Sequence, residues 1–573
     1  MEQRVTREEA IAALTGPGAR YAIEQAAVAG QTFATFQRLP RNLGQLYAET
    51  EPFDELEFLV HDDERISFRE ARRQAGNLAA RLLDQYGVLK GDRVAIAMRN
   101  CPEWCLSFMA VTSIGAVVVP LNAKWQAPEL EYGIRDTACR VAIVDGECLE
   151  KLRPVLGRLD LRVIVAREPA PPAGDVVALS GLLSGDDRRP PDVDVAPDDD
   201  AMLLYTSGVS DKPKGVLSTH RAVLTSIVAR ELFYLAEFGR HLPKQQFEAL
   251  VAYLNSRDGP SPGAKGQAVL IGLPLFHVTA CNALFLPSLR YGRKIVLMSR
   301  WQPERALELI ERERVTVFTG APVMTTDLVS SPDFAKRDLR TLVHVTTGGA
   351  RQRSRQAAEV KDRIGAAPGV GYGMTETNSV GTIVGGAAYV ARPDSAGCLM
   401  PLVELKVIDE KGREVRPGCE GEICIKSVAN MRGYWNRPDE TARTLRDGWV
   451  HTGDLGHIDA DGYVFITGRL KNLVIRGAEK ISCAEVEKAI YEHTSVREAA
   501  AFGTPDERWG ERLVAVVVPA DGETLSVAEI DSFLATRVAR FKIPARIIVL
   551  HELLPRLASG KIDVQALKSQ FDV

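Results

Sequence analysis

The chain has 573 residues, a formal net charge of −4 at pH 7 and a hydrophobic content of 45%. A chain of this length exceeds what one hydrophobic core supports, so we expect two or more domains. Acidic and basic residues are nearly balanced, so the chain has no overall positive charge that would attract nucleic acid. We therefore predict no nucleic-acid partner. The first residues run into a charged helical pattern and no apolar run is long enough to span a bilayer, so we predict no signal peptide and no transmembrane segment.

The nine cysteines are scattered along the chain without the paired spacing of a metal site, and their number is odd. An odd, unpaired set is typical of reduced thiols rather than of a disulfide framework. We therefore expect a cytoplasmic protein.

The first half alternates helical and apolar segments. A helix expected from residue 66 onward, with helical spacing at residues 75–83, precedes the expected strands near residues 93–98, 115–121 and 141–145. This alternation predicts a parallel α/β sheet that is covered on both faces. Residues 1–40 read as a helix and a surface arm, and residues 186–200 as a solvated linker. Residues 224–238 and 247–254 predict a helical hairpin, followed by a polar loop at 256–266. We favour packing of this hairpin on the core over a lid or an acyl-chain channel.

Residues 205–215 form a candidate phosphate loop, Tyr-Thr-Ser-Gly-Val-Ser-Asp-Lys-Pro-Lys-Gly, directly after an apolar run at 201–204. Small residues let backbone N–H groups approach phosphate oxygens, hydroxyls add donors, and Lys212 and Lys214 add positive charge. The spacing differs from the Walker pattern. Strand-end turns recur at residues 343–350 and 371–377, and in an open α/β sheet such turns converge on one ligand crevice.

Beyond about residue 396 the sequence pattern changes and predicts short strands, at residues 405–408, 421–425 and 463–467. Short strands bounded by turn signals predict a small barrel-like subdomain. The last hundred or so residues alternate strands and helices, which predicts a separate α+β domain.

The phosphate loop and residues 371–377, 449–454, 468–471 and 555–561 follow one another in an order that resembles the adenylate-forming superfamily. That superfamily includes acyl-CoA synthetases, luciferases and nonribosomal-peptide adenylation domains, and the resemblance runs from about Leu43 to Ile562. It implies an α/β fold with a large N-terminal domain, residues 1–468, made of parallel α/β sheets plus a small β-barrel subdomain at about 396–467. It also implies a small mobile α+β C-terminal domain, residues 469–573. The implied reaction joins a carboxylic acid to AMP and then transfers the acyl group to a thiol.

The resemblance implies four catalytic residues. Lys561 matches the lysine that bridges the carboxylate and the α-phosphate, a task that suits a compact ammonium. Glu376 matches the magnesium ligand, and Thr375 would donate to the α-phosphate. His277 would lie near the acyl and thiol ends of the substrates.

The resemblance also implies how ATP and coenzyme A bind. Asp454 would accept both ribose hydroxyls with help from Arg469, and Tyr372 would stack on adenine. Lys471 occupies the hinge position, while Gly477 and Ala478 would line the pantetheine tunnel. The remaining nucleotide-binding positions lie on the phosphate loop and the two other turns: Thr206, Ser207, Gly208, Ser210, Lys214, Gly349, Ala350, Gly371 and Gly373.

The phosphate loop departs from the superfamily pattern. Val209 removes a hydroxyl donor, and Asp211 adds negative charge where a glycine is usual. Because Lys561, Glu376 and Asp454 are all retained, we expect an active enzyme that uses ATP, Mg²⁺ and coenzyme A. A homologue that binds acyl-adenylate without turnover stays an alternative.

The acid is predicted from the pocket. Amino-acid-activating relatives place an aspartate where this chain has Phe276-His277-Val278, which argues against an amino-acid substrate. The expected lining is small or apolar and suits a hydrophobic acid: His277, Val278, Ala280, Cys281, Thr346, Thr347, Gly348, Gly371, Val380 and Gly381. We expect a medium- or long-chain fatty acid. An aromatic, alicyclic or steroid-derived acid is an alternative, as is delivery of the acyl group to a carrier protein. A homodimer is a further expectation.

Overall fold

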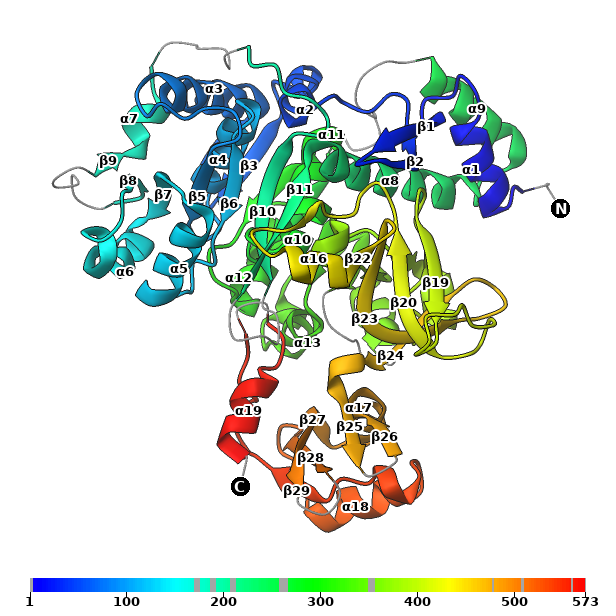
Figure 1. Cartoon of the computed structure of the whole chain (residues 1–573). Helices are drawn as coiled ribbons and strands as arrows, with labels where there is room; N and C mark the ends of the chain where they lie inside the picture. Colours follow the sequence, from blue (N-terminus) through cyan, green and yellow to red (C-terminus); the bar gives the residue numbers. More distant parts are fainter. Residues whose placement is uncertain are drawn as a thin grey trace.

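The computed structural model describes residues 4–168, 176–185, 192–206, 213–256, 266–348, 356–476, 479–506, 510–557 and 560–571. The molecule has the predicted α/β class. Two large sheets with their helices and a smaller barrel-like sheet form the N-terminal part, and a small C-terminal domain lies below them (Figure 1). None of the helices in these described ranges is long and apolar enough to cross a membrane.

The first large sheet has eight strands in the order β21-β11-β10-β6-β5-β7-β8-β9. The predicted strands are confirmed as β5 (Arg93–Ala97), β6 (Val117–Pro120) and β7 (Val141–Asp145), which pair in parallel. Helices connect them: α4 (Pro102–Ser113), α5 (Ala127–Thr137) and α6 (Gly146–Leu156). The other strands are β8 (Arg162–Ala166), β9 (Val177–Ala178), β10 (Asp200–Thr206), β11 (Lys214–Thr219) and β21 (Gly433–Tyr434). The sheet is not wholly parallel, because β10, β11 and β21 pair antiparallel at one edge.

The second large sheet has nine strands in the order β18-β17-β16-β15-β14-β12-β13-β3-β4. Its parallel centre is β12 (Ala268–Ile271), β13 (Lys294–Leu297), β14 (Val317–Gly320), β15 (His344–Gly348) and β16 (Ala367–Tyr372). At one side β3 (Glu57–His61) continues the parallel pairing beside β13. The edge strands are antiparallel: β4 (Glu64–Ser67), β17 (Thr382–Gly385) and β18 (Cys398–Leu399). The expected turns at residues 343–350 and 371–377 therefore leave the carboxyl ends of neighbouring strands, β15 and β16.

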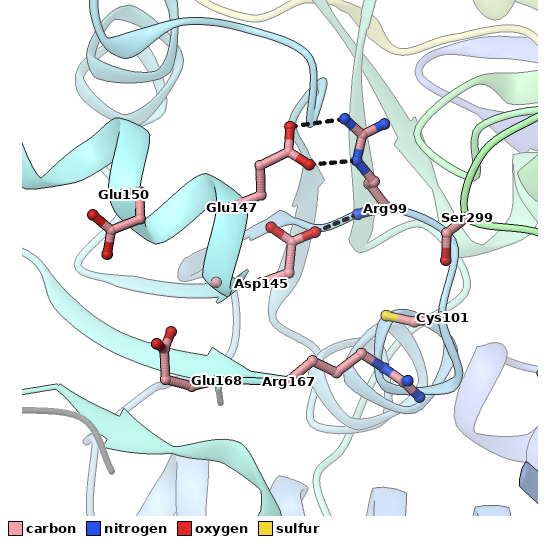
Figure 2. A pocket seen from close by; sticks show the side chains of 9 residues that line it. Arg99, Cys101, Asp145, Glu147, Glu150, Arg167, Glu168 and Ser299 are labelled. Carbon is pink, nitrogen blue, oxygen red and sulfur yellow. Dashed lines mark hydrogen bonds and ion pairs between the residues drawn. The ribbon is translucent and has the colours of Figure 1, made fainter. Parts of the chain in front are cut away.

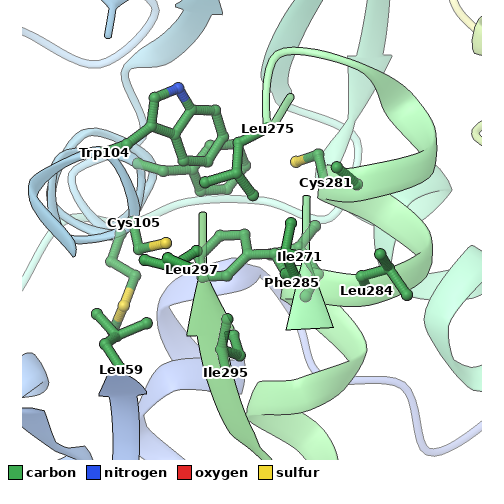
Figure 3. Close-up of a cluster of buried hydrophobic side chains, with 14 of the residues drawn as sticks. Leu59, Trp104, Cys105, Ile271, Leu275, Cys281, Leu284, Phe285, Ile295 and Leu297 are labelled. Atoms are coloured by element: carbon green, nitrogen blue, oxygen red, sulfur yellow. The ribbon is translucent and has the colours of Figure 1, made fainter. Parts of the chain in front are cut away.

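Helices between the two sheets carry the main core. Trp104 and Phe108 of α4 stack with centroids 5.4 Å apart, and Phe285 meets Trp104 edge-on at 5.9 Å (Figure 3). Phe285 belongs to η3 (Cys281–Phe285), a π-helical turn between α10 (Val278–Ala280) and α11 (Leu286–Tyr291). Such turns often lie at functional sites. Packing of these rings fixes the segment that follows His277 against the body of the protein.

The N-terminal segment is more than the surface arm that we expected. After α1 (Arg7–Thr15) the chain forms a hairpin of β1 (Ile23–Val28) and β2 (Gln31–Phe36). Tyr21 and Phe36 are buried in one cluster with residues of α8 (His220–Gly239), the first helix of the predicted hairpin. Its second helix is α9 (Lys244–Asn255), and most of the loop expected at 256–266 lies outside the described residues. The helical hairpin packs on the N-terminal segment.

The barrel-like prediction corresponds to a five-stranded antiparallel sheet. Its strands are β19 (Glu404–Ile408), β20 (Gly421–Lys426), β22 (Leu445–Arg446), β23 (Trp449–Ile458) and β24 (Val464–Arg469). The C-terminal domain has another five-stranded sheet, of β25 (Leu473–Arg476), β26 (Glu479–Ser482), β27 (Val496–Asp506), β28 (Gly510–Pro519) and β29 (Arg546–Val549). Its helices are α17 (Cys483–Tyr491), α18 (Val527–Ala535) and α19 (Val564–Phe571).

A buried histidine makes the stability of this fold depend on pH. His220, at the start of α8, accepts the Leu43 N–H through Nδ1 at 3.2 Å, and burial lowers its pKa to about 4. Histidine in the unfolded chain has a pKa near 6.5, so protons favour the unfolded state between these values. The contribution of His220 to the free energy of unfolding is fully present above about pH 6.5 and is lost as the pH falls toward about 4. We expect the free energy of unfolding to drop by up to about 1.4 kcal/mol per pH unit from His220 alone.

Chemical denaturation between pH 7.5 and pH 5 measures this slope. His220→Asn keeps an oxygen that can accept the Leu43 N–H but does not titrate. The variant should lose that part of the slope, and identical slopes in both proteins would contradict the assignment.

Candidate active site

Asp454 is almost fully enclosed. It lies on β23, is 2% exposed, and accepts hydrogen bonds from the Tyr372 hydroxyl at 2.7 Å and from Arg469 Nε at 2.6 Å. Tyr372 ends β16 and Arg469 ends β24, so three strands from two sheets meet at one carboxylate. The structure thus brings together the three residues predicted for the nucleoside. Burial, together with the charge of Asp454, keeps the pKa of the Tyr372 hydroxyl well above its usual range, so it remains a donor.

A bulge in β23 aims Asp454 at the site. The pairing of β20 with β23 shifts register between Glu422 and Cys424, and Gly453 takes the left-handed φ of 68° that favours glycine. Glu422 braces this bulge, because one of its carboxylate oxygens accepts the Gly453 N–H at 3.0 Å. The other oxygen lies 3.2 Å from His451 Nδ1.

Glu376 lies in η6 (Thr375–Thr377), directly after the end of β16. Its carboxylate is buried and accepts a hydrogen bond from the Tyr434 hydroxyl at 2.7 Å. Burial raises its pKa, and no lysine or arginine of the described ranges forms an ion pair with it. A buried carboxylate without a bound cationic side chain is a fitting ligand for a hard cation such as Mg²⁺.

Lys561 reaches this site from the C-terminal domain on a tight turn. Gly560 has a φ of 80°, and the Leu557 N–H donates to the Lys561 carbonyl at 2.8 Å. Arg556 donates to the Gly560 carbonyl at 2.7 Å and pairs with the buried Glu498. Burial and the neighbouring Arg469 lower the pKa of the Lys561 ammonium, whereas Asp454 and Glu376 raise it. The predicted catalytic lysine therefore lies within electrostatic reach of both site carboxylates.

His277 caps the start of α10 on the other side of Lys561. Burial lowers its pKa to about 4, and the ammonium groups of Lys561 and Lys124 act in the same direction. Its Nε2 is buried without a hydrogen-bond partner among the described residues. At neutral pH the ring is uncharged and has one nitrogen available for a ligand.

The described part of the phosphate loop is its closing hairpin. Thr206 Oγ1 faces the Lys214 carbonyl at 3.5 Å, and Lys214 Nζ forms an ion pair with Glu440 and lies 5.3 Å from the Tyr434 ring centroid. Ser207, Gly208, Ser210, Val209 and Asp211 lie outside the described residues.

The remaining predicted positions divide into two groups. Gly371, Gly373 and Thr375 lie on the β16 turn beside Tyr372 and Glu376, and Lys471 lies in η7 (Leu470–Asn472), at the start of the C-terminal domain. Outside the described ranges are Gly349, Ala350, Gly477 and Ala478.

Sequence reasoning missed several residues of the site. Four residues from distant segments act on the predicted ones. Three make direct contacts, namely Tyr434, Glu440 and Glu422. The fourth, Lys124, lowers the pKa of His277 through its charge. None carries a local motif that distinguishes it from an ordinary strand or surface residue. Their roles follow from β21 pairing with β11 and from the bulge opposite β20.

A separate cavity of about 440 Å³ opens at the carboxyl ends of β5 and β7 (Figure 2). Acidic side chains dominate its lining, and Glu147 takes two hydrogen bonds from Arg99, both at 2.7 Å. Asp145 accepts the Arg99 N–H at 2.8 Å. None of the predicted site residues lines this cavity, and its charges are largely used within the protein.

Glu422, Cys424 and His451 also offer ligand atoms that lie within 4.8 Å of one another. Both oxygens of Glu422 already face hydrogen-bonding groups. Burial raises the pKa of the Cys424 thiol to about 12, so it is a poor metal ligand at neutral pH. We read this group as the brace of the Asp454 bulge.

The model of the AMP-binding enzyme family matches residues 46–435, and that of the AMP-binding enzyme C-terminal domain matches residues 485–561. The chain belongs to the AMP-binding enzyme family. With the relatives below, this places it in the adenylate-forming superfamily as an AMP-forming acid–thiol ligase of the acyl-CoA synthetase type.

The relatives of this ligase are named for different carboxylic acids. A feruloyl-CoA synthase of Amycolatopsis sp is 35% identical, with 89% of this chain and 95% of the relative covered. An indoleacetate–CoA ligase of Aromatoleum aromaticum is 33% identical, covering 85% and 91%. A long-chain-fatty-acid–CoA ligase of Mycobacterium tuberculosis is 31% identical, covering 89% and 94%. The shared activity is acyl-CoA ligation, and the acid varies.

Solved structures support the same fold. MatB from Rhodopseudomonas palustris with bound ATP has a TM-score of 0.77 at 26% identity, covering 93% of this chain and 99% of that one. The o-succinylbenzoate CoA synthetase of Bacillus subtilis, in complex with its acyl-adenylate, has a TM-score of 0.73 at 27% identity, covering 92% and 98%. ATP binding by the ligase fits both the family and these neighbours.

The brace at Glu422 can be tested through ATP affinity. Glu422→Ala removes the acceptor of the Gly453 N–H, so the bulge that positions Asp454 should loosen. We expect the KM for ATP to rise about tenfold, because a hydrogen bond to a charged group contributes about 1.5–3 kcal/mol. The value of kcat should change much less.

Glu422→Gln is the matched control, since its amide oxygen still accepts the Gly453 N–H, and it should recover most of the affinity. A lower melting temperature with an unchanged KM for ATP would mean that Glu422 supports the barrel alone.

Proposed function

We propose that this ligase activates a hydrophobic carboxylic acid with ATP and Mg²⁺ and transfers the acyl group from acyl-AMP to coenzyme A. The observation that carries the proposal is the placement of Lys561. It is supported by the charges of Asp454 and Glu376, which act on the buried Lys561 ammonium from near the carboxyl end of β16. Both substrates of the first step are anions, so a cation between them lowers their repulsion in the transition state.

In this proposal Asp454 accepts the ribose hydroxyls and is oriented by Tyr372 and Arg469, which each hydrogen-bond one of its oxygens. Glu376 would hold Mg²⁺, with Tyr434 fixing one carboxylate oxygen. The ion would neutralise phosphate charge. Thr375 begins the same short helix and would donate to the α-phosphate.

We assign transfer of the acyl group to the thiol to the part of the site around His277. His277 is buried and neutral, and it would border the acyl group and the incoming thiol. We also propose the domain boundary at residues 468/469, with Lys471 as the hinge about which residues 469–573 move, and Gly477 and Ala478 as the pantetheine lining. All nine cysteines are free, and all but Cys419 are buried, which supports a cytoplasmic location.

A medium- or long-chain fatty acid is the first candidate for the acid. The apolar side chains of the expected lining support it, because Val380, Ala280 and Cys281 are fully buried. An aromatic or alicyclic acid is the second candidate. Gly348 and Gly371 support it, because they add no side chain to the expected lining.

The deciding experiment incubates the purified ligase with ATP, Mg²⁺ and coenzyme A across fatty, aromatic, alicyclic and amino acids, and detects AMP and thioester by mass spectrometry. Thioester from one class of acid supports the proposal and identifies the class. Acyl-adenylate without thioester points to a carrier protein as acceptor. Binding of acyl-adenylate with no release of pyrophosphate from any acid would reject catalysis.

Lys561→Ala should separate the two half-reactions. We expect the adenylation rate to fall about 100-fold or more, as for other single groups that stabilise transition-state charge. Thioester formation from supplied acyl-adenylate should stay within a few-fold, because that step does not place the lysine between two anions. The exposed Lys411 provides the control substitution, Lys411→Ala. Equal losses in both steps would show that the role is misassigned.

Asp454→Ala should act mainly on nucleotide binding. Loss of a carboxylate that would accept two ribose hydroxyls should raise the Kd for ATP about tenfold or more. Calorimetric titration with ATP measures this. An unchanged Kd in a folded variant would remove Asp454 from the nucleotide site.

A further inference from the structure

The turn that carries Glu376 has an unusual backbone. Asn378 and Ser379, directly after η6, have φ values of 51° and 63°, in the left-handed region that residues with a side chain rarely adopt. The turn also closes tightly, because a Cβ added at Gly373 would lie 2.8 Å from the Ser379 carbonyl carbon. Two successive residues in this conformation raise the energy of the turn, so the surrounding structure must hold them in place.

Asn378 holds the turn through its side chain. It is fully buried, and its Nδ2 donates to the Ala429 carbonyl at 2.8 Å. The same segment also holds Glu376, since the Met431 N–H donates to the Glu376 carbonyl at 2.8 Å. The chain then continues into β21, where Tyr434 fixes the Glu376 carboxylate. Asn378 therefore ties the turn to the segment that orients the Glu376 side chain.

A second asparagine bonds to the other amide atom of Asn378. Asn282 Nδ2 donates to Asn378 Oδ1 at 3.0 Å, and both residues are fully buried. Asn282 belongs to η3, the π-helical turn that follows the segment of His277, and the aromatic packing of Phe285 keeps η3 in place (Figure 3). This hydrogen bond thus connects the segment of His277 with the turn of Glu376.

Arg230 of α8 holds the second strained residue. It is 8% exposed, and its guanidinium donates to the Ser379 carbonyl at 2.8 Å. Three elements therefore hold the turn: α8, η3 and the segment that precedes β21. A turn that is held at so many points has little freedom to move, so Glu376 keeps one orientation.

Stability alone does not account for an asparagine at position 282. Its second amide atom, Oδ1, is buried without a hydrogen-bond partner among the described residues. Such an unpaired acceptor lowers stability in a way that an apolar side chain of the same size would not. An asparagine that carries this cost and donates to a strained turn beside a site carboxylate is typical of a residue that positions a functional group.

We infer that Asn282 and Asn378 are positioning residues for the metal-binding carboxylate of the ligase. Their hydrogen bond fixes the turn, so that Glu376 presents its carboxylate to Mg²⁺ in one orientation. A carboxylate that is already held in place binds the ion without losing conformational freedom, whereas a loose one must first be ordered. This inference rests on the proposed function, because the role of Glu376 as the Mg²⁺ ligand belongs to that proposal.

The test measures how much Mg²⁺ strengthens nucleotide binding. Calorimetric titration without acid gives the Kd for ATP in EDTA and in Mg²⁺, and the ratio of the first value to the second is the metal enhancement. We expect this enhancement to fall about five- to tenfold in Asn378→Gly, since the buried hydrogen bonds of that side chain are lost. The Kd for ATP in EDTA should change by less than about twofold.

The choice of variants separates side-chain positioning from backbone strain and from stability. Asn378→Gly adopts the left-handed φ without strain, so a loss in this variant comes from the missing side chain. Asn282→Leu keeps the size of the side chain. It removes one unpaired buried oxygen and leaves another at Asn378, so its melting temperature should stay close to that of the wild type while the metal enhancement falls as in Asn378→Gly. The double variant should be no worse than either single variant, because both break the same link.

Asn77→Ala is the matched control. Asn77 is a fully buried asparagine on α3 (Phe68–Asp84) whose Nδ2 donates to the Leu183 carbonyl at 3.0 Å. Its loss should lower the melting temperature and leave the metal enhancement at the wild-type value.

The outcomes separate the inference from the function on which it rests. An unchanged metal enhancement in Asn378→Gly and Asn282→Leu overturns the inference, whatever their stability. An equal loss in Asn77→Ala also overturns it, because the effect would then be general destabilisation. If Glu376→Gln keeps the wild-type metal enhancement, Glu376 is not the magnesium ligand, and that part of the proposed function is wrong. If Asn282→Leu does not fold, Asn378→Gly still decides.

Discussion

The carboxylate of Asp454 is the constraint on which the site depends. It takes one hydrogen bond from the end of β16 and another from the end of β24, and is almost fully buried. Arg469 pairs the charge within the same sheet, so separating the two sheets would remove the Tyr372 hydrogen bond from a buried carboxylate. The same group faces Lys561 of the C-terminal domain. One residue therefore links the proposed nucleotide site, the barrel-like sheet and the C-terminal domain that carries Lys561.

The charges around this carboxylate suit anionic substrates. Lys561 and Arg469 lie within electrostatic reach of Asp454, and His277 stays neutral because burial and the charges of Lys561 and Lys124 lower its pKa to about 4. Burial disfavours every charge here, and it lowers the pKa of Lys561 as well. A bound phosphate and carboxylate would offset that cost. The site is thus more stable electrostatically when it holds its substrates than when it is empty.

Contiguous motifs carried most of what could be predicted. Lys561, Glu376 and Asp454 each lie in a short sequence motif. The predicted strand-end turn at residues 371–377 carries Glu376, whereas Asp454 lies within β23 and Lys561 lies on a turn after β29. Contacts between distant segments were out of reach. Tyr434 and Glu376 are 58 residues apart, and Thr319 and Thr346 are joined by strand pairing across 27 residues. The His-Thr-Gly-Asp segment reads as a turn by itself, yet it is a bulge within β23, because only pairing with β20 defines it.

The contacts of the C-terminal domain suit the proposed movement of Lys561 between the two half-reactions. Its Lys561 turn is held from within by Arg556 and the buried Glu498. Its described contacts with the rest of the protein are sparser and more polar: the Lys488–Asp394 ion pair at 2.8 Å, a Ser482 hydroxyl on the Thr467 carbonyl, and Gly560 beside Ala321. Exposed ion pairs contribute less than about 1 kcal/mol each. Rotation would therefore break weak contacts and keep the turn intact, so the domain can carry Lys561 away as a rigid body.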